Sequence, residues 1–189
     1  LLSDGRKSQK TVQERYRDGV RHGPFTRWHA SGAMAEQGEY RDGRRQGLWT
    51  FRDSTGRRTA SGSYRDGKKH GDWSEWYSDG RLAGPVLLSE VRREDSQFSD
   101  GKLNGPFVAW YDDGIKQKEK GAYRNGEREG MWSADYKTTG MPKEQGAYSR
   151  GLRTGPWVSW YDGEGKRLRK LGEYRLGKEH GLWSRYYES

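Results

Sequence analysis

The sequence contains no cysteine and few of the apolar residues that usually build a core. Leu, Ile, Val and Phe together account for only 23 of its 189 residues. The lack of cysteine excludes a disulfide framework, a thiolate nucleophile and a Cys-based metal site. No apolar run approaches the roughly 18 to 20 residues that a membrane-spanning helix requires. An aliphatic core of ordinary size cannot be built from this composition.

Aromatic residues take the place of the missing aliphatic ones. Charged residues make up 33% of the chain and the mean hydropathy is −1.30, values that by themselves suggest disorder. The chain nevertheless carries 9 Trp, 12 Tyr and 4 Phe, and each large ring can bury roughly 150 to 250 Å². We therefore expect a folded domain with a thin, aromatic core.

The net charge is +9 and the calculated pI is 9.7, without a basic tail. This balance favours acidic partners, which include nucleic acid, anionic lipid and acidic protein surfaces. The chain starts at Leu1 rather than at a methionine, so a signal segment could have been removed. The sequence is compatible with two locations, the bacterial periplasm or envelope and the cytoplasm.

One pattern, Y-x-x-G-x-x-x-G-x-(W/F), recurs along the chain. It marks seven units that together form one repeat domain over residues 1–189. The spacings between unit starts are 24, 24, 34, 25, 25 and 26 residues. The units begin near Tyr16, Tyr40, Tyr64, Phe98, Tyr123, Tyr148 and Tyr174.

Each unit contains two turn signals, the first of them Asp-Gly or Asn-Gly in five units, as at Asp18-Gly19. Such dipeptides supply the positive φ angles of tight hairpins. The sequence therefore predicts an all-β fold, an elongated single sheet in which the chain runs as an antiparallel meander of hairpin repeats. Edge-to-edge self-association through the end strands would suit such an open sheet.

Aromatic residues four apart, such as Trp73 with Tyr77 and Trp157 with Tyr161, fall on one face of a strand. We expect them to form a ladder along the array. The glycine two residues before each Trp shares that face, and the pattern predicts that it leaves room for a neighbouring ring.

This pattern resembles the MORN repeat, and more closely the bacterial MORN-variant repeat Y-x-x-G-x-x-x-G-x-W-x-x-Y-x-x-x-G. The His-Gly steps at His22, His70 and His180 match that family, and the resemblance runs from Tyr16 to Tyr187. It implies a repeat scaffold without enzymatic activity. Proteins built from such units alone are often assigned to an antitoxin or immunity family that binds and blocks a toxin.

One longer interval, residues 81–97, interrupts the array. It holds the most aliphatic stretch of the chain, with two arginines after it: Val86, Leu87, Leu88, Val91, Arg92 and Arg93. One interpretation is a longer loop or short helix packed over the sheet, and the other is a protruding element that binds a partner.

The sequence offers no catalytic or metal-binding constellation. Its four histidines include three at the same repeat position, which separates them by whole units. The segment Gly67 to Gly71 lacks the residue order of a phosphate-binding loop. We expect no enzymatic activity, no metal and no cofactor.

Further rings precede the second ladder position: Trp28, Trp76, Trp110, Trp160 and Tyr186. Alternation places them on the opposite face, where they are either interface residues or part of a second buried layer. A basic stripe accompanies them, made of Arg17, Arg41, Arg65, Arg124 and Arg175.

The leading functional hypothesis is an antitoxin or immunity protein that neutralises a partner toxin or effector with an acidic surface. The alternative is a scaffold for anionic phospholipid membranes. Nucleic acid is disfavoured as a partner, because acidic residues between the basic ones interrupt the continuous positive surface that a phosphate backbone would need.

Overall fold

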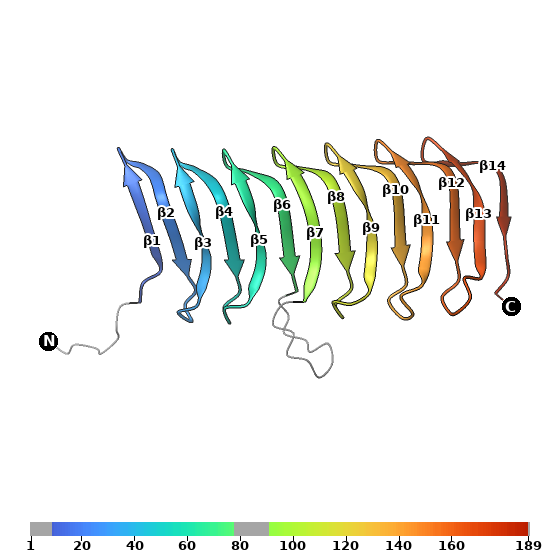
Figure 1. Ribbon diagram of the computed structural model, residues 1–189, viewed down its shortest axis with the longest axis horizontal. Coiled ribbons are helices and arrows are strands. Elements are labelled where there is room, and N and C mark those ends of the chain that lie inside the picture. Colours follow the sequence, from blue (N-terminus) through green and yellow to red (C-terminus); the bar gives the residue numbers. More distant parts are fainter. Residues whose placement is uncertain (1–8, 78–90, 189) are drawn as a thin grey trace.

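The computed structural model describes residues 9–77 and 91–188, and these residues form a single antiparallel sheet (Figure 1). The sheet has 14 strands in sequential order, so the predicted all-β meander is confirmed. The described residues contain no helix. The strands are β1 (Val12–Arg17), β2 (Val20–Trp28), β3 (Met34–Arg41), β4 (Arg44–Arg52), β5 (Arg58–Arg65), β6 (Lys68–Trp76), β7 (Arg92–Ser99), β8 (Lys102–Trp110), β9 (Gln117–Arg124), β10 (Glu127–Asp135), β11 (Pro142–Ser149), β12 (Leu152–Trp160), β13 (Leu168–Arg175) and β14 (Lys178–Arg185).

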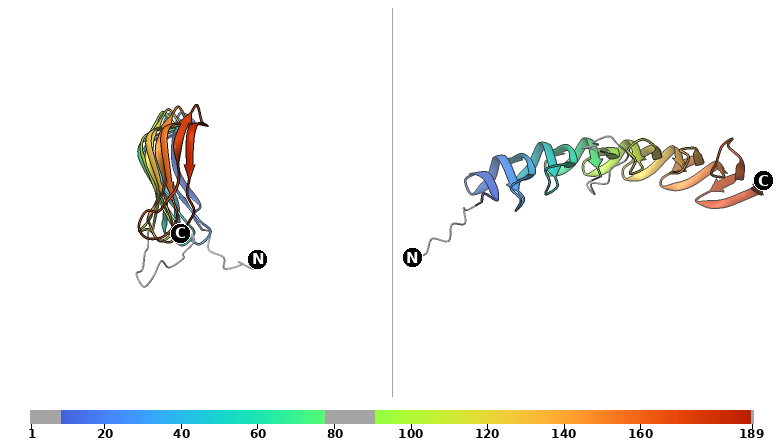
Figure 2. Two further views of the ribbon diagram at one scale, coloured as in Figure 1. Left: turned by 90° about the vertical axis from the view of Figure 1, so that its right-hand side faces the viewer. Right: turned by 90° about the horizontal axis from the view of Figure 1, so that it is seen from below.

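The sheet is one layer thick and elongated. Figure 1 shows the strands lying across the long axis, and the left view of Figure 2 shows them edge-on without a second layer. Each inner strand is hydrogen-bonded only to the strands just before and after it, which leaves β1 and β14 as the edges of the described sheet. Whether these edges mediate self-association stays a prediction.

The first turn of each unit has the backbone that its sequence predicts. Asp18, Asp42, Asp66, Asp100 and Asn125 all have φ near 50°, and each is followed by a glycine with positive φ. Two successive residues of this kind match the right-handed twist of the flanking strands. Two units adopt the same turn without Asp or Asn, through Arg150 and Leu176.

The glycine that makes room for the Trp ring is a different one from the glycine we expected. A Cβ added at Gly146 would overlap the ring of Trp157, whereas nothing lies within 4 Å of a Cβ added at Gly155, two residues before that Trp. Gly155 instead has a φ of 62°, and the pairing of β11 with β12 shifts register beside it. The same overlap recurs at Gly38, Gly62, Gly121 and Gly172, each beneath the Trp of the following strand.

Where this position is not glycine, the ring above it is smaller. Glu14 pairs with Phe25, and Ser96 pairs with Phe107, while the five glycines all lie beneath Trp. The ring and the residue under it therefore vary together, because a side chain at that position competes for the volume of the larger indole.

The ladder also joins different tyrosines from those predicted. Each Trp packs edge-on against the tyrosine that starts its own unit, as Trp157 does with Tyr148 at 5.2 Å, and against the next one, Tyr174, at 5.8 Å. Among the described residues these ring contacts form two runs, from Phe25 to Phe98 and from Phe107 to Trp183. Edge-to-face pairs of this kind contribute about 0.5–1.5 kcal/mol each beyond burial.

In four units the tyrosine four residues after the ladder ring bonds to the backbone instead. The hydroxyl of Tyr136 donates to the carbonyl of Trp160 at 2.8 Å, one unit further on, and Tyr77, Tyr111 and Tyr161 repeat this bond. In the first unit His29 takes the tyrosine's place, and its Nε2 donates to Arg52. Five of the six junctions are thus crossed by such a side chain; in the second unit Asp53 stands at this position and accepts bonds within its own turn instead.

The array continues in register after the long interval. Residues 92–97 of the predicted 81–97 insert belong to β7, and β7 pairs with β6 as Gly71 with Phe98 and Trp73 with Ser96. Residues 78–90 lie outside the described residues, and so do Val86, Leu87 and Leu88. The predicted loop or helix therefore stays a prediction.

Candidate binding surfaces of the sheet

We call the side of the sheet that carries Trp49, Trp73, Trp132, Trp157 and Trp183 the Trp face, and the other side the opposite face. On the Trp face, a positive side chain lies over nearly every indole. The guanidinium carbon of Arg153 is 4.2 Å from the ring centre of Trp157, and that of Arg128 is 4.0 Å from Trp132. Arg45, Lys69 and Lys170 cover the other three indoles at 4.1–4.3 Å.

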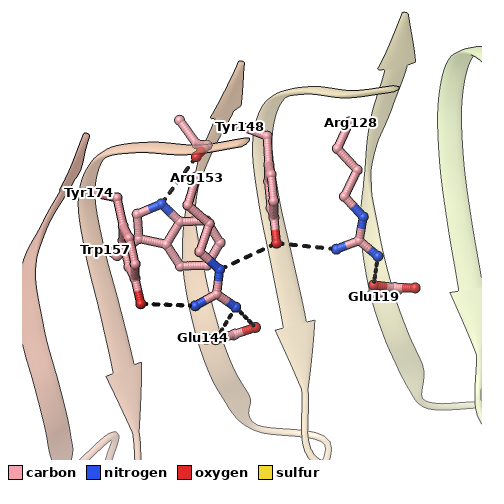
Figure 3. Close-up of polar contacts among 8 residues, drawn as sticks. Glu119, Arg128, Glu144, Tyr148, Arg153, Trp157 and Tyr174 are labelled. Carbon is pink, nitrogen blue, oxygen red and sulfur yellow. Dashed lines mark hydrogen bonds and ion pairs between the residues drawn. The ribbon is translucent and has the colours of Figure 1, made fainter. Parts of the chain in front are cut away.

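Each arginine also bonds to an acid and to two tyrosines (Figure 3). The Arg153 guanidinium donates to both oxygens of Glu144 at 3.0 and 3.2 Å, and it reaches the hydroxyls of Tyr148 and Tyr174. Tyr148 also accepts from Arg128, which pairs with Glu119 at 2.7 Å. The polar groups therefore form a continuous chain along this part of the array.

This network favours the charged form of the arginines further. Burial opposes the charge of Arg153, but the hydrogen bonds to Tyr148 and Tyr174 and the charge of Glu144 outweigh it, so its pKa lies above the usual value. Lys69 occupies the same repeat position in another unit with fewer partners. There burial prevails over the attraction of Glu94, and the pKa of Lys69 is lowered.

Sequence reasoning missed these pairs, although a signal was present. The acid stands nine residues before the arginine in Glu36–Arg45, Glu119–Arg128 and Glu144–Arg153. In the last unit the same spacing joins Lys170 to Glu179 with the charges exchanged. A search for opposite charges nine residues apart would have found all four.

The Trp face is hollowed near its C-terminal end. A groove of about 400 Å³ extends over β11–β14, with rings and positive side chains along its walls. Its lining includes Lys143, Glu144, Arg153, Trp157, Tyr161, Arg169, Lys170, Tyr174, Trp183 and Arg185. Five cations line the groove; Glu144 pairs with Arg153 and Glu179 pairs with Lys170 and Arg185, which leaves the groove with an excess of positive charge. Trp, Tyr and Arg are the residues enriched at protein interfaces.

On the opposite face, the predicted rings are only partly accessible. Trp76 is 7% exposed, under Arg58 and Arg92, whereas Tyr186 is 43% exposed and, at the end of the array, also lines the groove of the Trp face. Trp28, Trp110 and Trp160 are half-buried. Arg52 and Asp135 occupy the same repeat position in two units, so the rings do not make one contiguous patch. Their role as binding residues stays a prediction.

Of the candidate residues predicted in the long interval, the structure describes Val91, which is buried, and Arg92 and Arg93, which are exposed. Val91 is buried and packs against Gly114, while its carbonyl accepts from the Tyr77 amide. Arg92 lies over Trp76 and pairs with Asp95, and Arg93 pairs with Glu75 on the Trp face.

The repeated histidine position has a structural role at the hairpin ends. His22 Nδ1 accepts from the Asp42 amide of the next unit at 3.5 Å, and Gln46, Asn104 and Glu129 do the same in their units. His70 stands at the same position, but its buried Nδ1 has no hydrogen-bond partner among the described residues, so the bond is not shared by all units.

Within residues 9–77 and 91–188, no group of three or more His, Asp or Glu side chains could hold a metal ion. The same residues include no helix long and apolar enough to cross a membrane.

A comparison with protein families matches residues 21–42 to the MORN repeat variant. That span runs from β2 to the turn after β3, the length of one unit, and it supports a MORN-repeat protein, a class of scaffold that is generally non-catalytic. A search of curated proteins finds no match.

Proposed function

We propose that this chain is a non-enzymatic scaffold that binds a partner protein, and that the partner is a toxin or effector which it neutralises. The observation that carries the proposal is the groove of about 400 Å³ on the Trp face, with its aromatic walls and excess of cations. A single-layer sheet leaves such a face open to a partner along its length. The resemblance to MORN-variant antitoxins supports a toxin as the partner.

The groove is a better candidate than the rings of the opposite face. Its side chains are held in place by the ladder and by the Glu–Arg–Tyr bonds. A partner therefore pays little conformational entropy to meet them, which favours affinity. Trp76, by contrast, is already buried against its own chain.

The test is co-expression with the products of neighbouring genes, followed by co-purification and by survival of cells that express the candidate toxin. We expect a stable complex and restored growth. The double variant Lys143→Glu/Arg169→Glu should abolish both, because it reverses two charges in the groove. The variant Arg124→Glu/Arg175→Glu makes the same change in net charge on the opposite face and should leave both intact.

Membrane association is the outcome that would contradict this function. Flotation with vesicles that contain acidic lipid distinguishes the two. Retention that requires acidic lipid and disappears at high salt, without any protein complex, would favour the membrane scaffold.

A further inference from the structure

A bulge residue occurs at every junction between units. Where β8 pairs with β9, Ala109 is opposite Glu119 and Trp110 is opposite Gln117, which leaves Lys118 without a partner in the ladder. The other junctions follow the same pattern. The residues left out are Ala35, Thr59, Arg93, Lys118, Lys143 and Arg169. Bulges of this kind re-aim a side chain, and they occur often beside functional sites.

The last four of these residues are all cations, and we call them the cation row: Arg93, Lys118, Lys143 and Arg169. All four are exposed. Arg93 pairs with Glu75, but no ion pair joins Lys118, Lys143 or Arg169 to another described residue. Lys143 and Arg169 instead lie over the rings of Tyr136 and Tyr161, at 5.7 and 6.0 Å.

Three neighbouring cations without acids are not needed for folding. The two earlier bulge residues, Ala35 and Thr59, show that a neutral side chain completes the same junction. The cations therefore have no structural counterpart in the first half of the array, and their charges are available to a ligand.

The spacing of the row restricts the ligand. Equivalent residues of adjacent units are two strands apart, which is about 9.6 Å for the usual distance between strands. A polyproline II segment turns once in three residues and rises about 9.3 Å in that turn, so every third side chain faces the same way. Acids at every third position of such a segment would meet successive cations of the row.

The tyrosines beside the row suit the same ligand. Tyr111, Tyr136 and Tyr161 are half-buried, and each ring is fixed by the bond from its hydroxyl to the next unit. Fixed aromatic rings along a groove are the surface that polyproline II segments recognise.

We infer that the cation row is a binding site for an extended acidic segment of a partner protein, in polyproline II conformation, with an acid at every third residue. This inference rests on the proposed function, since it names the part of the partner that the Trp face would hold. Neither a bilayer nor a nucleic acid has this spacing of charge built into an ordered backbone.

The probe is a fluorescent peptide of repeated Glu-Pro-Pro, and its binding is measured by anisotropy. The comparison peptide has the same composition, with its glutamates gathered at one end. We expect the periodic peptide to bind at least fivefold more tightly. Equal binding would overturn the inference, because it would show that charge alone decides.

The variant Lys118→Gln/Lys143→Gln/Arg169→Gln should weaken binding of the periodic peptide about tenfold or more, a few-fold for each pair lost. Its matched control is Arg41→Gln/Arg124→Gln/Arg175→Gln, which removes three exposed charges near the hairpin turns. The control should lose less than twofold. Equal losses in the two variants would overturn the site.

Acidic vesicles and an oligonucleotide of equal charge complete the test. If either of them binds more tightly than the periodic peptide, and loses affinity in the Lys118→Gln/Lys143→Gln/Arg169→Gln variant, then it and not the acidic segment is the ligand. If the peptide does not bind but the protein still captures a toxin, the cation row is rejected as the site and the proposed function stands. Peptide binding without any toxin complex would instead reject the proposed function and leave the site.

Discussion

The first six strands and the last eight share one framework but carry different residues on it. Both halves stack Trp between tyrosines above a glycine, as Trp49 does over Gly38 and Trp157 over Gly146. At the bulges, however, the first half has Ala35 and Thr59, and the second half has the cation row. On the opposite face of the second half, a hollow of about 410 Å³ is lined by Pro106, Val108 and Met131.

The difference separates what the fold needs from what it tolerates. Glycine, Trp and the first tyrosine recur wherever a ring must be stacked, so they are determined by packing. The bulge residue makes no ladder pair. It is buried in the first unit, as Ala35, but exposed at Arg93, Lys118, Lys143 and Arg169. An exposed position of this kind carries a charge without disturbing the packing of the sheet, which makes it suitable for specificity.

Removal of a ladder ring should produce the largest effect, and the same effect in both halves. Trp49→Ala and Trp157→Ala each delete a buried indole, which costs about 3–5 kcal/mol of unfolding free energy. Denaturant unfolding followed by far-UV circular dichroism measures both. Losses that differ by more than about 1.4 kcal/mol, a factor of ten in the equilibrium, would show that the halves do not share one framework.

A side chain added at the glycine beneath the ring should have the second largest effect on stability. Gly146→Ser crowds Trp157 and should cost about 1–3 kcal/mol. Adding Trp157→Phe recreates the natural pair of Ser96 and Phe107, so the double variant should lose less than the sum of the single ones. Strict additivity in thermal unfolding would refute the coupling between the ring and the residue below it.

Restoring a missing cation should stabilise the junction between the two halves. Leu103 occupies the position that Arg45, Arg128 and Arg153 occupy in their units, and Glu94 on β7 stands nine residues before it, where those units have their acid. The second run of ring contacts begins at Phe107, in the same strand as Leu103. Leu103→Arg should add up to about 1 kcal/mol through Glu94 and the Phe107 ring. The test is the denaturant midpoint, with Leu103→Gln as the uncharged control; a gain in both variants would exclude the ion pair.

Extending the cation row into the first half should have a smaller effect, this time on binding. Thr59→Lys places a cation at the bulge between β4 and β5, next in line to Arg93. We expect about a two- to threefold tighter complex with the periodic Glu-Pro-Pro peptide, as one more exposed pair provides. Thr26→Lys, which adds the same charge to the opposite face, should change nothing.

Acid should lower the stability of the second half slightly more than that of the first. In the second half, a hydrogen bond and the charge of Arg65 lower the pKa of Asp100, the hydroxyls of Thr138 and Thr139 lower that of Asp162, and Lys170 lowers that of Glu179. In the first half, desolvation opposes the charge of Asp53, but hydrogen bonds from Thr55 and Arg57 outweigh it and lower its pKa. A carboxyl with a lowered pKa stabilises the fold above its unfolded pKa, and this contribution is lost as pH falls through the folded value. Stability should decline below about pH 4.

Burial raises the pKa of Asp135, which acts in the opposite direction and keeps the effect small. Hydrogen exchange at pH 5 and pH 3 measures the two halves separately. Earlier loss of protection in β1–β6 would contradict the assignment of these carboxyls.

Periodicity alone was sufficient to predict the sheet, its order and its first turns, because Asp-Gly and spaced rings have few other solutions. It could not assign the glycines correctly. Gly146 and Gly155 look equivalent in the sequence, but only the backbone shows that one is extended under Trp157 and the other has positive φ.

The candidate groove was not predictable to the same extent. A bulge depends on one extra residue between paired strands, so the exposure of Lys143 cannot be read from alternation. The ion pairs, by contrast, follow a spacing of nine residues that the sequence itself contains. The rings of the opposite face were predicted by position, whereas the burial of Trp76 depends on Arg58 and Arg92 above it.

Because every strand lies across the long axis, tension between the two ends of the array would act at right angles to the strands. Such a load opens one ladder of hydrogen bonds at a time, starting from an edge, instead of shearing all of them together. The bonds from Tyr136 and its equivalents span most junctions, so they raise the force at which a unit is released there, whereas the junction after the second unit, with Asp53 in place of the tyrosine, lacks this bond. The array would behave under load as a stepwise extensible tether, lengthening by one unit per event.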